Sequence, residues 1–234
     1  MKIANGIEML EITATVMGNT NTIYPTLLWD EQNTILVDTG YPGQLPIIIE
    51  AMENAGVSFR KLNKIILTHQ DLDHIGSLPD IIHESPQKVE VLAHELEKPF
   101  IQGDKRLLKL PKDTSHIPEG LRAVFEHPPA AQVDGIIKDG DELPYAGGLI
   151  VIDTPGHTPG HISLYHKPSR TLIAGDALVA KDHQLYGPAR EHTLDMDTAI
   201  QSLKAFTHYD IENVICYHGG LCGTNMNKRI KELA

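Results

Sequence analysis

The sequence predicts a protein that mixes strands and helices, of the α/β (α+β) class. Two observations lead to this prediction. Short apolar runs recur along the chain and are followed in places by segments with helical spacing. In addition, each half of the chain has apolar runs that end in clusters of His or Asp beside glycine. This recurrence indicates two comparable β-rich halves, each with polar chemistry at the ends of its strands.

The first part of the chain predicts strands joined by turns and followed by a helix. Expected strands cover residues 9–16, 23–29, 34–37 and 64–67. Residues 18–21 have the composition of a turn. Residues 46–54 have helical spacing, and Gly56 is well placed to stop that helix. Because the run at 64–67 reads as a buried strand, the His and Asp cluster that follows it should lie on a loop at a strand end.

The second part of the chain continues the same alternation. Further strands are expected at residues 88–92, 148–153, 162–165, 171–174 and 214–217, and helices at 197–206 and 225–233. Residues 94–134 are long, mixed and contain prolines, so we expect either a covering insertion or a partly mobile segment, and we expect it to form part of a pocket wall. No Gly-, Ser- or Pro-rich linker divides the chain, and we predict one domain over residues 1–234.

The charge of the chain bears on its partners. The formal net charge is −11, from 20 Lys and Arg against 31 Asp and Glu. A surface that binds nucleic acid or anionic membrane needs basic patches, so this composition disfavours both partners. A small phosphate ester in a metal pocket stays possible, because bound cations dominate the local field there. We therefore expect a small-molecule substrate, whereas the sequence leaves the oligomeric state open.

Cysteine usage and the N-terminus predict the compartment. Two cysteines, Cys216 and Cys222, are too few for a disulfide framework and are expected to be reduced. The first residues carry acids and no long apolar run, so they do not resemble a signal peptide. No stretch approaches the roughly 18 apolar residues of a membrane span. These features favour a cytoplasmic protein.

Four glycine-punctuated clusters carry the chemistry among the 13 histidines of the chain. They are HQDLDHIG at 69–76, DTPGHTPGH at 153–161, AGD at 174–176 and YHGG at 217–220. Four such clusters, each after an apolar run, point to a shared metal centre. Eight histidines lie outside these clusters. Apart from His183, they are expected to be structural or solvated: His83, His94, His116, His127, His166, His192 and His208.

This combination of motifs resembles the metallo-β-lactamase superfamily. The hallmark of that family is H-x-H-x-D-H on a strand-end loop, then G-H-T-x-G-H, then an Asp after a strand and a late His. The motifs occur here in the family's order, from about Met9 to Gly219. The resemblance implies an αββα four-layer sandwich in which two β-sheets pack face to face, helices lie outside and metals bind at the open edge.

The resemblance also implies a dinuclear metal site with two divalent ions, zinc foremost and iron or manganese as alternatives. Six residues match ligands of the family: His69 and His157 for the first metal, Asp73, His74 and His218 for the second, and Asp176 as the bridging carboxylate.

Asp71 departs from the family pattern, which usually has His at this position. A carboxylate can still bind zinc at about 2.0–2.2 Å, and we expect Asp71 to be a ligand of the first metal. It makes the site less positive and harder, which shifts its preference toward Mn²⁺ or Fe²⁺. The flavodiiron branch of the family has Glu at the matching position. The alternative is that Asp71 only hydrogen-bonds to a ligand.

Residues around the predicted ligands have a supporting role. Histidines that bind metal usually donate their other ring N–H to a carboxylate or carbonyl. Asp38, at the end of a neighbouring strand, is the best candidate for this partner, and Thr68 and His161 are weaker ones. Another candidate group, Lys181, His183 and Tyr186, is expected in a loop that either contacts substrate or is an ordinary polar loop.

The function implied by the resemblance is a metal-dependent hydrolase. In this class a bridging hydroxide attacks an ester-like carbon, and Asp73 could shuttle a proton. Small esters, thioesters and lactones are the expected substrates. We expect no C-terminal helical domain of the kind with which glyoxalase II binds glutathione. The alternatives are a phosphodiesterase, a di-iron redox protein related to the flavodiiron branch, and a metal-binding protein with little catalysis whose first site is weakened by Asp71.

Overall fold

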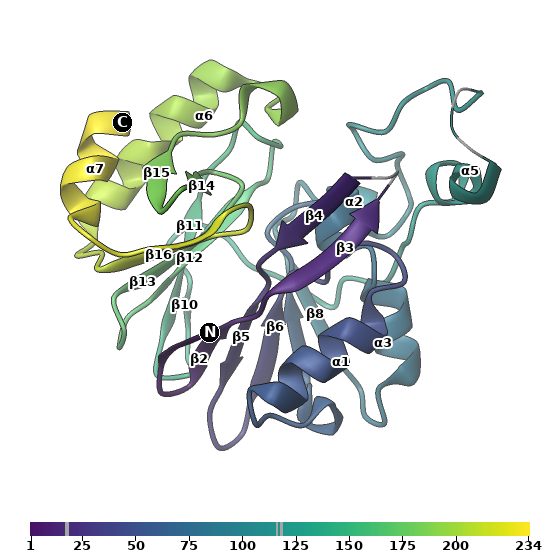
Figure 1. The fold of residues 1–234 in the computed structure, drawn as a ribbon, viewed down its shortest axis with the longest axis horizontal. Helices are drawn as coiled ribbons and strands as arrows, with labels where there is room; N and C mark the ends of the chain where they lie inside the picture. Colours follow the sequence, from purple (N-terminus) through teal and green to yellow (C-terminus); the bar gives the residue numbers. More distant parts are fainter. Residues whose placement is uncertain (17–18, 116, 118) are drawn as a thin grey trace.

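Two β-sheets pack face to face with helices on their outer faces, which gives the four layers αββα (Figure 1). The computed structural model describes residues 1–16, 19–115, 117 and 119–234. One sheet has seven strands in the order β1-β2-β5-β6-β7-β8-β9, and the other has six in the order β10-β11-β12-β13-β16-β17. The predicted αββα sandwich is therefore confirmed.

The first sheet is built from the N-terminal half of the chain. Its strands are β1 (Lys2–Ala4), β2 (Ile7–Met9), β5 (Thr26–Trp29), β6 (Thr34–Val37), β7 (Lys64–Ile66), β8 (Glu90–Ala93) and β9 (Gly135–Ile136). Strands β6, β7, β8 and β9 run parallel to one another. Helices α1 (Leu45–Asn54) and α3 (Leu78–Glu84) lie on its outer face (Figure 1). Parallel strands place their carboxyl ends at one edge, which is where the first polar cluster begins.

The second sheet is built from the C-terminal half of the chain. Its strands are β10 (Glu142–Leu143), β11 (Leu149–Asp153), β12 (Ile162–His166), β13 (Thr171–Gly175), β16 (Asn213–Cys216) and β17 (Gly220–Cys222). Its outer face is covered by α6 (Met196–Ser202), the 3₁₀-helix η3 (Leu203–His208) and α7 (Met226–Leu233) (Figure 1). Two hairpins complete the fold: β3 (Ile12–Val16) with β4 (Asn19–Ile23), and β14 (Val179–Lys181) with β15 (Gln184–Tyr186).

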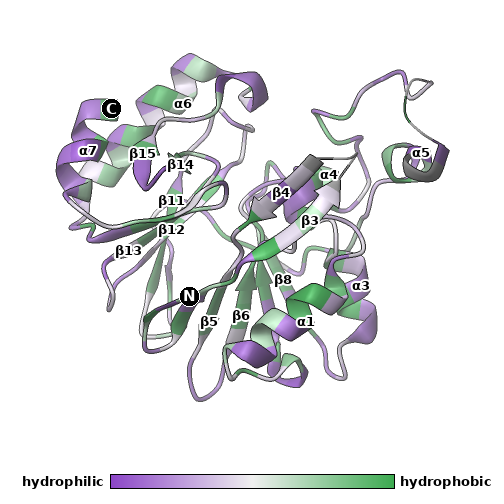
Figure 2. Cartoon of the chain, viewed as in Figure 1, coloured by the Kyte–Doolittle hydropathy of each residue, from purple (hydrophilic) through white to green (hydrophobic). Residues whose placement is uncertain are grey.

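Alternation along the strands explains why both faces of each sheet are buried. In β6, Ile35 and Val37 point to the core between the two sheets, whereas Leu36 points to the core under α1. In β11, Val151 joins the central core and Ile152 joins the core under the C-terminal helices. Successive side chains of a strand point to opposite faces, so these apolar runs serve two cores at once. Figure 2 shows green along β5, β6 and β8 of the first sheet and purple along much of α7 at the outside of the second.

The remaining elements differ in part from those predicted. The expected strands at 9–16 and 23–29 are each divided, because β3 and β4 leave the sheet as a separate hairpin and Pro25 has no N–H to continue a ladder. Of the expected turn at 18–21, Gly18 lies outside the described residues and the rest lies in β4, so that prediction is wrong. The helix expected at 197–206 is α6 followed by η3.

The segment from 94 to 134 contains the short helices α4 (Lys98–Ile101) and α5 (Glu119–Glu126), and α5 lies at the periphery (Figure 1). Within the described part of the chain, every helix is too short or too polar to cross a membrane.

Gly76 lies at a close backbone crossing beside the first polar cluster. It follows the helix α2 (Leu72–Ile75), and its N–H donates to the carbonyl of Gly40 at 2.8 Å. A Cβ atom at this position would lie 2.3 Å from the backbone nitrogen of Pro42. Its φ is −59°, a value open to any residue, so the lack of space requires glycine here.

We expect Gly76→Ala to lower the free energy of unfolding by about 1–3 kcal/mol, as overpacking of a close contact does. Gly187→Ala is the matched control, because a Cβ there meets no atom within 4 Å. Urea unfolding of the two variants beside the wild type measures the difference. Equal stability of all three proteins would show that the backbone near Pro42 moves aside for the added methyl group without cost.

Candidate metal centre

Seven side chains from four loops converge at one edge of the sandwich, where strands of both sheets end. His69, Asp71, Asp73 and His74 follow β7, His157 follows β11, Asp176 follows β13 and His218 follows β16. They are the seven residues predicted as metal ligands. They form three overlapping groups, and within each group the ligand atoms all lie within 4.8 Å of one another: His69, Asp71 and His157; His69, His74 and Asp176; and Asp73, His74 and His218.

The local structure after β7 explains why the short motif at residues 69–74 contributes ligands to two different groups. The chain is extended through Asp71, which precedes the helix α2, so Asp73 and His74 lie in the first turn. The carbonyl of His74 accepts hydrogen bonds from the N–H and the hydroxyl of Thr39, at 2.7 and 2.8 Å. Extended residues and a helical turn point their side chains in different directions, so the motif divides between two groups.

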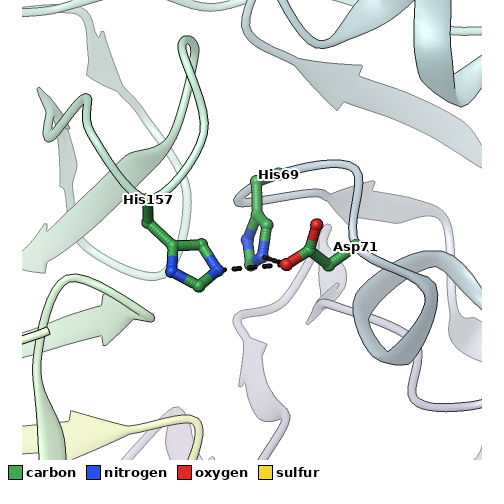
Figure 3. Close-up of side chains that lie close together, drawn as sticks. All are labelled: His69, Asp71 and His157. Atoms are coloured by element: carbon green, nitrogen blue, oxygen red, sulfur yellow. Dashed lines mark hydrogen bonds and ion pairs between the residues drawn. The ribbon is translucent and has the colours of Figure 1, made fainter. Parts of the chain in front are cut away.

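The first group, called here the Asp71 side, consists of His69, Asp71 and His157 (Figure 3). The Oδ2 atom of Asp71 lies 3.2 Å from Nε2 of His69 and 3.1 Å from Nε2 of His157. Ligands of a tetrahedral ion with bonds of about 2.1 Å lie about 3.4 Å apart. The three side chains therefore have the spacing that one metal ion requires.

The Asp73 side consists of Asp73, His74 and His218. The Nε2 atom of His218 lies 3.2 Å from Oδ2 of Asp73, and Nε2 of His74 lies 3.8 Å from the same oxygen. These separations also suit a single ion, although the pair that includes His74 is somewhat wider.

Asp176 lies between the two sides. Its Oδ2 atom is 3.2 Å from Nε2 of His157 and 3.4 Å from Nε2 of His218, and its Oδ1 atom is 3.4 Å from Nε2 of His74. One carboxylate thus reaches imidazoles of both sides. This is the position that a carboxylate bridging two ions would take.

Buried polar atoms that make no hydrogen bond support the fit to metal. Within the described residues, His69 Nε2, His74 Nε2 and Asp176 Oδ1 are such atoms, and their close polar neighbours are other ligand atoms of the cluster, at 3.2 to 3.4 Å. Leaving such groups unsatisfied costs about 1–3 kcal/mol each, and native proteins rarely do so without reason. All three atoms belong to one group of converging ligand atoms, so bound ions would satisfy them together.

The electrostatics keep the carboxylates ionised. Burial raises the pKa of Asp71, but neighbouring His69 and Lys109 outweigh it and hold that pKa well below its usual range. Burial lowers the pKa of His218, but the charge of Asp176 outweighs it and raises that pKa to about 10. The carboxylates are thus in the form that binds metal, while metal binding at His218 has to displace a proton.

Asp38 supports His74 from behind, as expected. The carboxylate of Asp38 accepts hydrogen bonds from Nδ1 of His74 at 2.9 Å and from the N–H and hydroxyl of Thr68, both at 2.8 Å. This fixes the His74 ring with Nε2 toward the cluster. Asp38 itself has φ of +63°, a left-handed conformation that Asp and Asn tolerate better than most residues.

His161 supports Asp176 and is not among the converging ligand groups. Its Nε2 atom accepts from the backbone N–H of Asp176 at 2.9 Å, and its Nδ1 pairs with the hydroxyl of Thr154 at 2.8 Å. The ring therefore fixes the backbone that presents the central carboxylate.

Glu97 is a supporting residue that the sequence did not reveal. It is fully buried and accepts from the backbone and side-chain N–H groups of Gln70, at 3.0 and 2.9 Å, and from the N–H of Gly160 at 2.7 Å. One carboxylate thus ties the loop of His69 and Asp71 to the loop of His157. Its only sequence signal was its place in the segment 94–134, where no motif singled it out.

A cavity of about 470 Å³ opens over the cluster. Its lining includes Tyr41 and the exposed His192 beside the carboxylates of Asp71, Asp73 and Asp176. Neither Tyr41 nor His192 was predicted to be a site residue. Burial raises the pKa of Tyr41, and the charges of Asp73 and Asp176 raise it further, so its phenol is neutral.

The hairpin β14–β15 does not contribute the side chains considered for substrate contact. Lys181, His183 and Tyr186 are absent from the described lining of this cavity, and His183 instead lines a separate hollow against α7. Of the two alternatives, the structure favours an ordinary polar loop, because the tip of the hairpin lies toward the C-terminal helix. Of the other histidines, His116 lies outside the described residues.

An αββα sandwich with paired His and Asp groups at its open edge defines a class of metal-binding folds that contains many hydrolases. The chain belongs to the metallo-beta-lactamase superfamily, whose model matches residues 19–218. That match includes all seven residues of the cluster.

Similar proteins agree with this assignment. The chain is 30% identical over 231 residues to the protein named probable metallo-hydrolase YflN of Bacillus subtilis, covering 92% of this chain and 86% of that one. It is 30% identical over 150 residues to a hydroxyacylglutathione hydrolase of Buchnera aphidicola, covering 64% of this chain and 44% of the relative. The family, the clusters and these relatives together indicate a metal-dependent hydrolase.

A solved structure shows the same fold. The metallo-beta-lactamase family protein TTHA1429 of Thermus thermophilus superimposes with a TM-score of 0.74 at 24% identity, over 99% of this chain and 79% of that one.

We expect Asp38→Asn to weaken metal binding by about 10- to 100-fold, because His74 loses its charged partner while the shape of residue 38 is kept. Asp182→Asn is the matched control, since Asp182 also has positive φ, +50°, but is exposed on the β14–β15 turn. Competition with a chromophoric zinc chelator gives both affinities. Equal affinities for the two variants would show that Asp38 does not tune the site.

Proposed function

We propose that this protein is a metal-dependent hydrolase that cleaves a small ester, thioester or lactone, with zinc as the resident ion. The observation that carries the proposal is the position of Asp176, whose carboxylate lies between two groups of ligands under an open cavity. Four of the seven cluster residues are imidazoles, which suit zinc, although Asp71 keeps manganese and iron as alternatives.

The residues of the cluster support hydrolysis in distinct ways. Bound divalent ions in such a site activate water near neutral pH and polarise the oxygen of a substrate. Asp73 lies both in the Asp73 side and in the cavity lining, so its carboxylate is placed to carry a proton toward a leaving group. The neutral phenol of Tyr41 lines the same cavity and can donate a hydrogen bond to a substrate oxygen.

The cavity supports a small, uncharged reacting group. A volume of about 470 Å³ is within the range of sites for small molecules. Three carboxylates line it, and they leave a metal-loaded site less positive than one built mainly from imidazoles, which favours a neutral acyl group over an anionic phosphodiester. One relative carries the name hydroxyacylglutathione hydrolase, a name that denotes an acyl substrate, and this supports the acyl class.

A substrate panel tests the proposal directly. Zinc-loaded protein is assayed with p-nitrophenyl esters, acyl thioesters, simple lactones and bis-p-nitrophenyl phosphate. We expect turnover of at least one acyl substrate, and its loss after chelation and recovery with zinc. Turnover of the phosphodiester alone would move the protein to the phosphodiesterase class, and two tightly bound irons with an oxygen-sensitive absorption band would point to redox chemistry.

We expect Asp176→Ala to lower metal content and to abolish hydrolysis together, because the carboxylate serves both sides of the cluster. Asp197→Ala, at an exposed position in α6, controls for loss of a surface charge. Metal analysis and the acyl assay are run on the same preparations. Normal metal content with normal turnover in Asp176→Ala would show that this carboxylate does not hold the ions.

A further inference from the structure

Lys109 reaches the Asp71 side from a distant part of the chain. Its Nζ atom lies 2.6 Å from Oδ2 of Asp71 and 2.7 Å from Nε2 of His157. The side chain is 20% exposed, so it lies largely inside the site. The ammonium therefore contacts two of the three side chains that would bind the first metal ion.

We propose that Lys109 is a built-in cation that occupies the Asp71 side, so that the protein holds one metal ion on the Asp73 side and takes a second only when Lys109 leaves. The inference rests on the proposed role of the cluster in metal binding. It adds that the two sides of the cluster differ in their occupancy by metal, a difference that the ligand residues alone do not imply.

The contacts of Lys109 and those of a metal ion exclude each other. An ion on the Asp71 side would bind Asp71 and His157 at about 2.0–2.2 Å, through the same two atoms that the ammonium contacts. These atoms are 3.1 Å apart, so the small space between them holds either an ion or the ammonium. A metal that enters the Asp71 side must therefore break two contacts of Lys109.

The chain around Lys109 is anchored to the site and the core. The backbone N–H of Leu108 donates to Oε1 of Gln70 at 2.8 Å. Gln70 lies between His69 and Asp71 in the sequence, so this bond ties the chain next to Lys109 to the loop of the Asp71 side. Leu107 is buried in the core under the first sheet, and Leu110 packs against that core. Because both neighbours are fixed, Lys109 enters the site with little extra loss of backbone freedom.

The charge of the site supports the same asymmetry. Asp71, Asp73 and Asp176 place three negative charges in the cluster, and one divalent ion with one ammonium balances them. An imidazole at position 71 would offer the ammonium no negative partner, whereas a carboxylate makes a charge-assisted hydrogen bond with it. Asp71 and Lys109 are thus two parts of one arrangement.

Metal stoichiometry tests the proposal. Metal-free wild type, Lys109→Ala, Lys109→Arg and the control Lys112→Ala, an exposed position in the same segment, are each titrated with zinc, and bound zinc is counted after desalting. We expect one tightly bound zinc per chain in the wild type, Lys109→Arg and Lys112→Ala. Lys109→Ala should hold two, with the affinity for the second ion raised about tenfold or more by removal of the competing hydrogen bonds.

The outcomes separate this inference from the proposed function. Two equally tight ions in the wild type, with no change in Lys109→Ala, would overturn the role of Lys109 and leave the hydrolase proposal standing. A wild type that binds no zinc, manganese or iron would overturn both.

A second measurement uses the wild-type protein and does not depend on the folding of a variant. Reductive methylation of lysines is followed by mass spectrometry in protein holding one zinc and in protein forced to hold two by excess zinc. Entry of the second ion should expel Lys109 and raise its methylation several-fold, while Lys112 stays unchanged. A second ion that binds with no change at Lys109 would contradict the proposal.

Discussion

The structure depends on one constraint, which is that a buried cluster of carboxylates and imidazoles must be neutralised where two sheets end. Ionised groups are removed from water only when other charges or metal ions compensate them. Here the seven side chains are brought together by loops that β7, β11, β13 and β16 position at one edge. The surrounding polar groups, above all Asp38 and Glu97, hold these loops in place through hydrogen bonds to backbone and ring N–H groups. The cavity and its chemistry follow from that arrangement.

Much of this could be predicted from the sequence because the informative signals are local. Each strand that leads to the site is a short apolar run, and each ligand lies a few residues beyond its end. Asp38 could be proposed as a partner for the same reason, since it follows β6 directly. The ligand roles of the seven residues stay predictions, although the geometry brings all of them together.

The parts that the sequence did not reveal depend on contacts between distant residues. Lys109 lies 38 residues from Asp71 and 48 from His157, within a segment that has no clear periodicity. Glu97 lies in the same segment and reads as an ordinary acidic residue. The hairpin β14–β15 shows the reverse case, because His183 is close to Asp176 in sequence but lines a hollow against α7 in space. Sequence distance was misleading in all three cases.

We propose that the cluster binds metal and that its two sides are unequal because Lys109 fills one of them. Anomalous diffraction from crystals of zinc-loaded protein, measured at the zinc edge, locates the ions directly. We expect a strong peak among Asp73, His74 and His218, and weak or absent density for zinc beside Asp71 with the Lys109 side chain in its place. No peak within the cluster, or two peaks of equal strength with Lys109 still in contact with Asp71, would contradict it.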